Sequence, residues 1–256
     1  MQDIIFKGVK CLFIKVRIHV HIYKMVLNFS VFLSSLVSVS LFAEQPPKRP
    51  TCVVKVTKTI VVNGTLDGKG CVYTWRGAGY PKNCNSPKEI SENQPAMFEL
   101  KPGANLKNLH MECALDGIHT SQNNIIENIV NRDVEEDAIT IGNNITVRNS
   151  KFYFCNDKCL QMNKAKNVRI EGNYFYSANT AVLANYGQNI VVKNNYFKEI
   201  KKTAIRAVTR VGVRSDITAS YNQIVNAQCG LRSETGSQVI NGAGNVFKNV
   251  ETKTCK

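Results

Sequence analysis

The 256-residue sequence lacks the marks of a helical protein. No segment carries ten or more residues with the apolar stripe at a period of 3.6 that an amphipathic helix requires. The leucine framework of leucine-rich repeats is missing as well. A disordered chain is also excluded, because 43% of the residues are hydrophobic, which is ordinary for a protein with a core. What remains is a series of short β-branched segments, and we expect an all-β fold.

Cysteine-based metal patterns are scarce. Three residues separate Cys155 from Cys159, but no histidine or second cysteine pair lies near them at the spacing of a zinc site. Apart from Cys11, near the N-terminus, the chain has an even number of cysteines, at positions 52, 71, 84, 113, 155, 159, 229 and 255. An even set is typical of disulfides in an oxidising compartment, although the sequence does not give their pairing.

Long uncharged apolar runs are also rare, and the clearest one covers residues 26–42. It ends in the small-residue pattern of residues 41–43, which is typical of a signal-peptidase site. We therefore expect residues 1–43 to be a leader and the mature protein to be secreted, extracellular and not attached to a membrane. The alternative is a membrane anchor, since about 17 apolar residues are near the lower limit for a span. Residues 1–24 are either an over-long gene start before Met25 or a basic region that precedes the signal.

Acidic residues are fewer than basic ones. The sequence has 33 lysines and arginines against 19 acidic residues, a net charge of +14, of which +10 remains without the expected leader. Such an excess indicates a polyanionic partner, unless the charge only aids solubility. The basic and aromatic residues do not form a recognised nucleic-acid module, so we expect no nucleic-acid partner. An acidic polysaccharide suits a secreted protein better.

From Ala96 onward the chain repeats. Similar segments begin at Asn144, Asn167, Asn189, Asp216 and Gln238, and an asparagine follows in each, at positions 149, 173, 195, 222 and 245. Periods of 20 to 30 residues indicate a solenoid, and short β-branched runs suit parallel strands stacked roughly 4.8 Å apart. We predict a single-domain right-handed parallel β-helix over residues 52–256, in which the asparagines form a structural ladder. A proline-rich lead-in (44–51) should be extended or disordered, and an insertion between Cys71 and Pro95 should cross one face.

Three charged residues stand 21 positions apart: Asp116, Asp137 and Lys158. Aligned by the repeat, one column reads Asp116, Asp137, Lys158, Thr180 and Thr203, and its neighbour reads Leu115, Glu136, Asp157, Asn179 and Lys202. Carboxylates one coil apart can converge on a hard cation such as Ca²⁺, which takes about six to eight oxygen ligands. Without a cation, the two stacked aspartates should repel and one pKa should rise. The alternative is an acidic surface turn neutralised by Lys158 alone.

Five motifs together resemble the pectate lyases of polysaccharide lyase family 3. They are TIVVNGTLDGK at 59–69, MFELKPGANLKN at 97–108, DGIH at 116–119, DVEEDA at 133–138 and DKxxQxN at 157–163. The resemblance is close over about residues 53–165 and continues by pattern in the remaining coils. It implies a secreted, monomeric, calcium-dependent enzyme that cleaves the (1,4)-α-D-galacturonan of pectin by β-elimination and leaves unsaturated oligogalacturonides.

The resemblance also implies roles for individual residues. The metal ligands would be Asp116, Asp133, Glu136 and Asp137, and Lys158 would be the base that removes the C5 proton of the uronate. A lysine acts as a base only if its pKa is depressed, which a nearby cation favours and neighbouring carboxylates oppose. The expected substrate contacts are Asp157, Gln161, Asn163, Asn185 and Lys202.

Two positions depart from the family pattern. Family members usually carry a second lysine where this chain has Gly142, and an arginine where it has Asn185. Arg206, one coil further on, is a candidate substitute for the missing cation. A catalytically weakened β-helix that binds calcium and pectate is therefore the second hypothesis. A hydrolase is disfavoured, because Lys158 lies amid the carboxylates that hydrolysis would use. We expect His119 to be a core or ladder residue and Trp75 to pack its own loop.

Overall fold

The computed structural model describes residues 44–78, 94–209 and 212–256. The expected leader and most of the expected insertion lie outside the described residues. Within the described ranges every regular element is a β-strand, and no helix is long and apolar enough to cross a membrane. Residues 45–256 form one unit.

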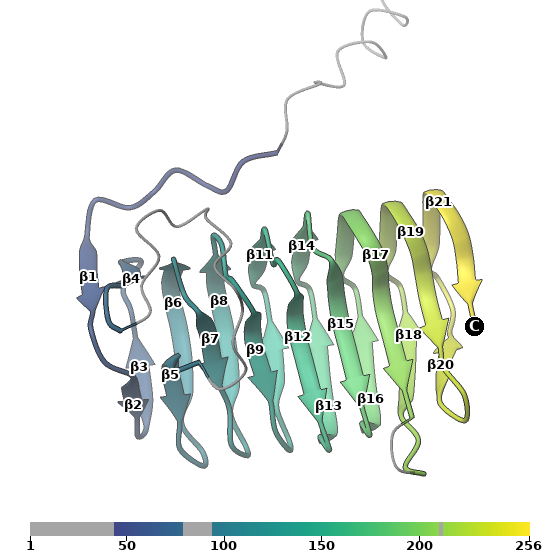
Figure 1. The fold of residues 1–256 in the computed structure, drawn as a ribbon, viewed down its shortest axis with the longest axis horizontal. Helices are drawn as coiled ribbons and strands as arrows, with labels where there is room; N and C mark the ends of the chain where they lie inside the picture. Colours follow the sequence, from purple (N-terminus) through teal and green to yellow (C-terminus); the bar gives the residue numbers. More distant parts are fainter. Residues whose placement is uncertain (1–43, 79–93, 210–211) are drawn as a thin grey trace, which may run out of the picture. The chain divides into compact units, whose positions relative to one another are not determined.

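The strands of this unit wind into a right-handed parallel β-helix, as the repeat predicts (Figure 1). Every pairing between neighbouring coils is parallel, and the coils build three sheets. The first sheet contains β2 (Ile60–Val62), β5 (Ala96–Leu100), β7 (Asp116–His119), β9 (Asp137–Ile141), β12 (Lys158–Asn163), β15 (Thr180–Asn185) and the ends of β17 (Tyr196–Val208), β19 (Gln223–Ser233) and β21 (Val246–Cys255).

The other two sheets follow the same order along the axis. The second contains β3 (Thr65–Asp67), the starts of β6 (Asn105–Glu112) and β8 (Ile125–Asn131), then β10 (Thr146–Arg148), β13 (Lys166–Glu171), β16 (Gln188–Lys193), β18 (Asp216–Ser220) and β20 (Gln238–Asn241). The third contains β1 (Val53–Val56), β4 (Val72–Trp75), the ends of β6 and β8, β11 (Lys151–Tyr153), β14 (Tyr174–Tyr176) and the starts of β17, β19 and β21.

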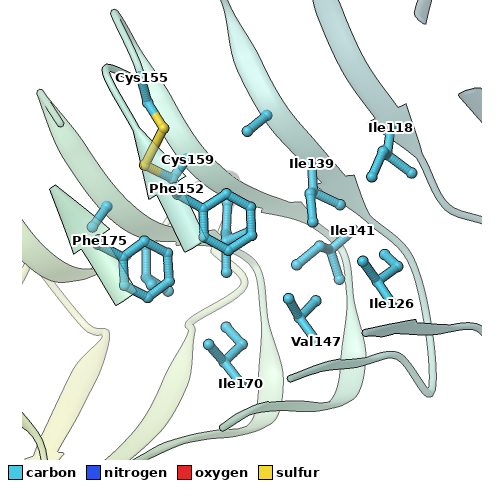
Figure 2. Packing of buried hydrophobic residues seen from close by; sticks show 14 of the residues in the cluster. Ile118, Ile126, Ile139, Ile141, Val147, Phe152, Cys155, Cys159, Ile170 and Phe175 are labelled. Atoms are coloured by element: carbon cyan, nitrogen blue, oxygen red, sulfur yellow. A yellow bond between two sulfur atoms is a disulfide. The ribbon is translucent and has the colours of Figure 1, made fainter. Parts of the chain in front are cut away.

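Inward side chains stack in columns along the axis. In the first sheet, one fully buried column consists of Phe98, Ile118, Ile139, Leu160, Val182, Ile205 and Leu231. In the third sheet the rings of Phe152 and Phe175 stack at 5.0 Å (Figure 2). The rings of Phe175 and Phe197 stack at 4.8 Å. Burying each large apolar side chain contributes about 1.5–3 kcal/mol, so the columns hold the coils in register.

An asparagine ladder lines the turn before the third sheet. Asn173, Asn195 and Asn222 are buried, and each accepts the backbone N–H of the coil before through its side-chain oxygen. The prediction that Asn149 is the first member of the ladder is wrong by one residue. Ser150 occupies the ladder position: its N–H donates to Asn173, and its hydroxyl accepts the Ile129 N–H. Asn149 instead has a left-handed φ of 52°.

The N-terminal part differs from the expectation in one way. The segment expected to be an insertion begins as the buried strand β4. Trp75 in that strand is 2% exposed, as expected for a packing residue. The proline-rich lead-in is held against the unit, because Arg49 forms a bidentate pair with Glu112 and Arg132 donates to the Pro47 carbonyl.

Disulfides form as the cysteine count predicts. Cys52 pairs with Cys71, Cys155 with Cys159, and Cys229 with Cys255. Cys113 is disulfide-bonded as well, and Cys84 lies outside the described residues. The Cys155–Cys159 bond excludes the metal interpretation of that pair.

Candidate active site

The predicted charged column exists on the first sheet. Asp137 lies directly opposite Lys158, which lies opposite Thr180, and Thr180 lies opposite Thr203. Asp116 belongs to the same column, because β7 and β9 pair with the matching register. The stacking of parallel coils therefore turns a spacing of 21 residues into direct contact.

Small residues follow each member of the column. A Cβ atom on Gly117 would lie 2.2 Å from the carbonyl oxygen of Ala138, so only glycine fits beside Asp116. The matching positions in the later coils are Ala138, Cys159, Ala181 and Ala204, and all four are buried. These small side chains bring the strands of successive coils close together and place the charged residues at the strand starts.

Asp116 makes one side-chain contact and leaves one oxygen unused. Its Oδ2 lies 2.6 Å from Nε2 of His119, and its Oδ1 is buried without a hydrogen-bond partner in the described part of the chain. The pKa of His119 is raised, chiefly by this hydrogen bond, against the opposing effect of burial. The sequence-based expectation that His119 is a core or ladder residue is therefore wrong. The side chain of His119 is partly exposed and is the partner of Asp116.

Lys158 lies between two carboxylates. Its Nζ is 3.2 Å from Oδ1 of Asp137 and also pairs with Oδ2 of Asp157. Burial disfavours the charged amine, but the attraction of the two aspartates outweighs it and raises the pKa of Lys158. Burial raises the pKa of Asp137 to about 7, with Lys158 opposing and Asp116 adding to the rise. One carboxyl pKa does rise as predicted, although burial contributes more than repulsion.

Of the other two predicted metal ligands, Glu136 adjoins the column in sequence, whereas no column residue is among the groups that act on the carboxyl of Asp133. Oδ1 of Asp133 accepts the backbone N–H of Cys113 at 2.7 Å, and burial raises the pKa of Asp133 to about 6. Glu136 is half-buried, and its N–H donates to the Leu115 carbonyl, as the predicted neighbouring column requires. Over residues 44–78, 94–209 and 212–256, no three Asp, Glu, His or Cys side chains form a metal-binding group.

The predicted substrate contacts differ in how exposed they are. Lys202 and Asn163 are exposed, and Asp157 and Gln161 are partly exposed, on the coils around Lys158. Asn185 is only 4% exposed, and its amide donates to Oδ1 of Asn163. Its side chain therefore stabilises the contact between two coils.

The two departures from the family pattern also have structural counterparts. A Cβ atom on Gly142 would lie 1.9 Å from the carbonyl oxygen of Ser121, so no lysine fits there without a backbone shift. Arg206 lies two coils from Gln161 in the same column, and its Nε donates to Glu234 at 2.8 Å. Neither the role of Glu234 nor the His119–Asp116 pair was predictable from the sequence, because both depend on side-chain direction rather than on spacing.

The fold and this column define the class of protein, a parallel β-helix with a largely buried acidic and basic row along one sheet. The chain belongs to the pectate lyase family, whose sequence model matches residues 44–238.

Several solved structures match this chain at low sequence identity. The enzymatically active domain of tailspike protein 2 from bacteriophage CBA120 matches with a TM-score of 0.53 and 12% identity over 76% of this chain and 39% of its own. PfbA, a surface adhesin of Streptococcus pneumoniae, matches with a TM-score of 0.49 and 15% identity over 81% of this chain and 59% of its own. Endopolygalacturonase I from Stereum purpureum matches with a TM-score of 0.35 and 15% identity over 83% of this chain and 92% of its own. The chain thus spans less than two thirds of the first two proteins.

Proposed function

We propose that this protein is a secreted, calcium-dependent pectate lyase of polysaccharide lyase family 3, which acts as a monomer on polygalacturonate by β-elimination. The observation that carries the proposal is the column Asp116, Asp137 and Lys158 on the first sheet of a pectate lyase family member. It brings together carboxylates for a cation and an amine for proton removal. The disulfides support passage through an oxidising compartment.

The aspartates of the column fit a hard cation. Asp116 has a buried oxygen without a partner among the described residues, and Asp137 is a second buried carboxylate one coil away. Buried carboxylates are costly unless they are paired or ligate a metal. Asp116 and Asp137 would hold calcium, with Glu136, which precedes Asp137 in the sequence, and Asp133 as the further ligands that the family resemblance implies. When bound, calcium would supply the positive charge that acidifies the proton beside a uronate carboxylate.

Lys158 is the proposed base. In the metal-free protein two carboxylates hold its ammonium and raise its pKa, which keeps it protonated. Neutralising the charge of Asp137 would weaken this hold, so the amine would lose its proton more readily. A lysine base needs an unprotonated amine, and we therefore expect an alkaline pH optimum. The proton would move from C5 of the uronate to Nζ while the C4–O bond breaks.

Binding of pectate without efficient cleavage is the second candidate function. Two observations favour it: the position expected to carry a second lysine has no room for a side chain, and Arg206 is paired with Glu234. Both would reduce the positive charge available to the substrate carboxylates.

The deciding experiment incubates the purified protein with polygalacturonate, with calcium or with a chelator, and follows the ultraviolet absorbance of unsaturated products. We expect product only with calcium and fastest at alkaline pH. A protein that retains polygalacturonate in a pull-down assay but forms no product would establish the second candidate. Product formation that is unchanged in the chelator would contradict the role of calcium.

A further inference from the structure

We propose that the Cys155–Cys159 disulfide is a positioning device that holds Lys158 at the reaction site, so that turnover depends on its oxidised state. The inference rests on the proposed lyase function, in which Lys158 removes the proton.

The disulfide encloses the charged part of the site. It closes a loop of five residues, 155–159, and two of the three residues inside the loop are Asp157 and Lys158. Both cysteines are buried in the main core, the cluster to which Phe152 also belongs (Figure 2). The crosslink therefore anchors to the core the loop that carries Lys158 and one of its two carboxylate partners.

The backbone of this loop matches its two neighbouring coils differently. Residues 134–137 of the preceding coil pair with residues 155–158 in register, so the two loops have equal length. On the other side, the consecutive amides of Asn179 and Thr180 donate to carbonyls two residues apart, at Cys155 (3.2 Å) and Asp157 (3.1 Å). The loop thus has one residue more than the coil that follows it, as in a β-bulge, where the extra residue is left out of the ladder. Regular stacking hydrogen bonds therefore match this loop on one side only.

Neighbouring coils do not use a crosslink here. At the position of Cys159 they have Gly117, Ala138, Ala181 and Ala204, and at the position of Cys155 they have Ala114, Val134 and Ala178. Small side chains are thus sufficient for stacking at both positions. The cysteines occur in the coil whose loop carries the proposed base, which points to a role in presenting Lys158 rather than in building the solenoid.

The chain itself supplies the test variant and its control. Alanine is accepted at both positions in adjacent coils, so Cys155→Ala/Cys159→Ala should fold with an unchanged circular dichroism spectrum. The matched control is Cys229→Ala/Cys255→Ala, which removes a disulfide far along the chain from Lys158. In the test variant we expect kcat to fall about tenfold to a hundredfold, since displacing a reacting group by about 1 Å can cost about a hundredfold. KM should stay within about twofold, and the control should keep its kcat within about twofold.

A second measurement does not depend on activity. In hydrogen exchange of the calcium-free full chain, the amides of residues 156–159, Asn179 and Thr180 should exchange at least about tenfold faster in the test variant than in the wild type, while those of β9 and of residues 181–185 in β15 remain protected. Unchanged exchange in this loop, or an unchanged kcat in an active enzyme, would overturn the inference. Faster exchange throughout the molecule would also overturn it, because the bond would then support the whole fold. A wild-type protein without lyase activity would refute the proposed function, and the exchange data would still decide whether the disulfide orders the loop.

Discussion

The two carboxylates that hold Lys158 differ in burial. Asp137 is 2% exposed and lies in the column, whereas the side chain of Asp157 is 40% exposed. Solvent screens the interaction with Asp157 more strongly, so the buried Asp137 is the partner that ties Lys158 to the column. Because Asp137 also faces Asp116, a cation bound there would compete directly with the ammonium of Lys158.

Lys158→Ala tests the assignment of the base. We expect kcat to fall by about a hundredfold to ten-thousandfold, the usual contribution of general acid–base catalysis. Polygalacturonate binding should change much less, and the exposed Lys55→Ala on the third sheet is a control for the loss of one positive charge. The assay follows unsaturated product and, separately, retention of the protein by immobilised polygalacturonate. Full activity in the Lys158 variant would eliminate it as the base.

His110 provides a pH-dependent contribution to stability away from the site. Its pKa is lowered by burial and by the positive charge of Arg132, although Glu112 opposes the shift. The unfolded chain therefore binds the proton more tightly than the folded chain does. The contribution is fully present above the unfolded pKa of about 6.5 and is lost as the pH falls through the lower folded value.

His110→Val removes this titration and keeps the packing, because Val72 and Val130 occupy the same column in the adjacent coils. As the pH falls from about 7.5 to about 5.5, the melting temperature of the wild type should decrease more than that of the variant. The other titrating groups are common to both proteins and cancel in the comparison. A difference in melting temperature that does not vary with pH would show that His110 keeps its proton affinity on folding.

At the scale of elements, two asparagine ladders run along the solenoid and differ in burial. In the inner ladder, Asn222 accepts the N–H of Asn195 and donates to the Val192 carbonyl, both in a buried turn. In the outer ladder, the exposed Asn189 has a φ of 54° and donates to Asn167. Only the inner ladder satisfies backbone groups that water cannot reach, so it should contribute more to stability.

Asn222→Ala should therefore lower the free energy of unfolding by about 2–4 kcal/mol, since each buried group left without a partner costs about 1–3 kcal/mol. Asn189→Gly should cost less than about 1.5 kcal/mol, because glycine keeps the left-handed φ and water replaces the exposed bond. Urea unfolding, monitored by circular dichroism, measures both. Equal losses in the two variants would contradict a special role of the inner ladder.

The parts of the structure that repeat were predictable from the sequence. Stacking maps a constant residue spacing onto one column, so Asp116, Asp137 and Lys158 could be aligned without coordinates. Features that break the repeat were not predictable from the sequence. The ladder residue was misplaced to Asn149 because an adjacent serine can accept the same hydrogen bond. The extra residue before Lys158 and the Arg206–Glu234 pair depend on the length and direction of particular turns, which residue spacing does not encode.

At the scale of the whole molecule, a solenoid is held by contacts between adjacent coils, and its terminal coils have one neighbour instead of two. Disulfides link adjacent coils at both ends of the described fold. Cys52 and Cys71 precede the paired strands β1 and β4, and Cys229 and Cys255 lie in the paired strands β19 and β21. The crosslinks therefore occur where stacking is weakest.

Cys229→Ala/Cys255→Ala should release the last coil before the rest of the solenoid. Removing a crosslink over 26 residues costs about 2–4 kcal/mol, mainly by freeing the unfolded chain. Because stability is distributed coil by coil, the amides of β21 should lose protection from hydrogen exchange first, while those of β9 and β12 remain protected. A solenoid that unfolds in one cooperative step would instead lose protection equally in β21 and β12, and the terminal disulfide would then stabilise the whole domain rather than its end.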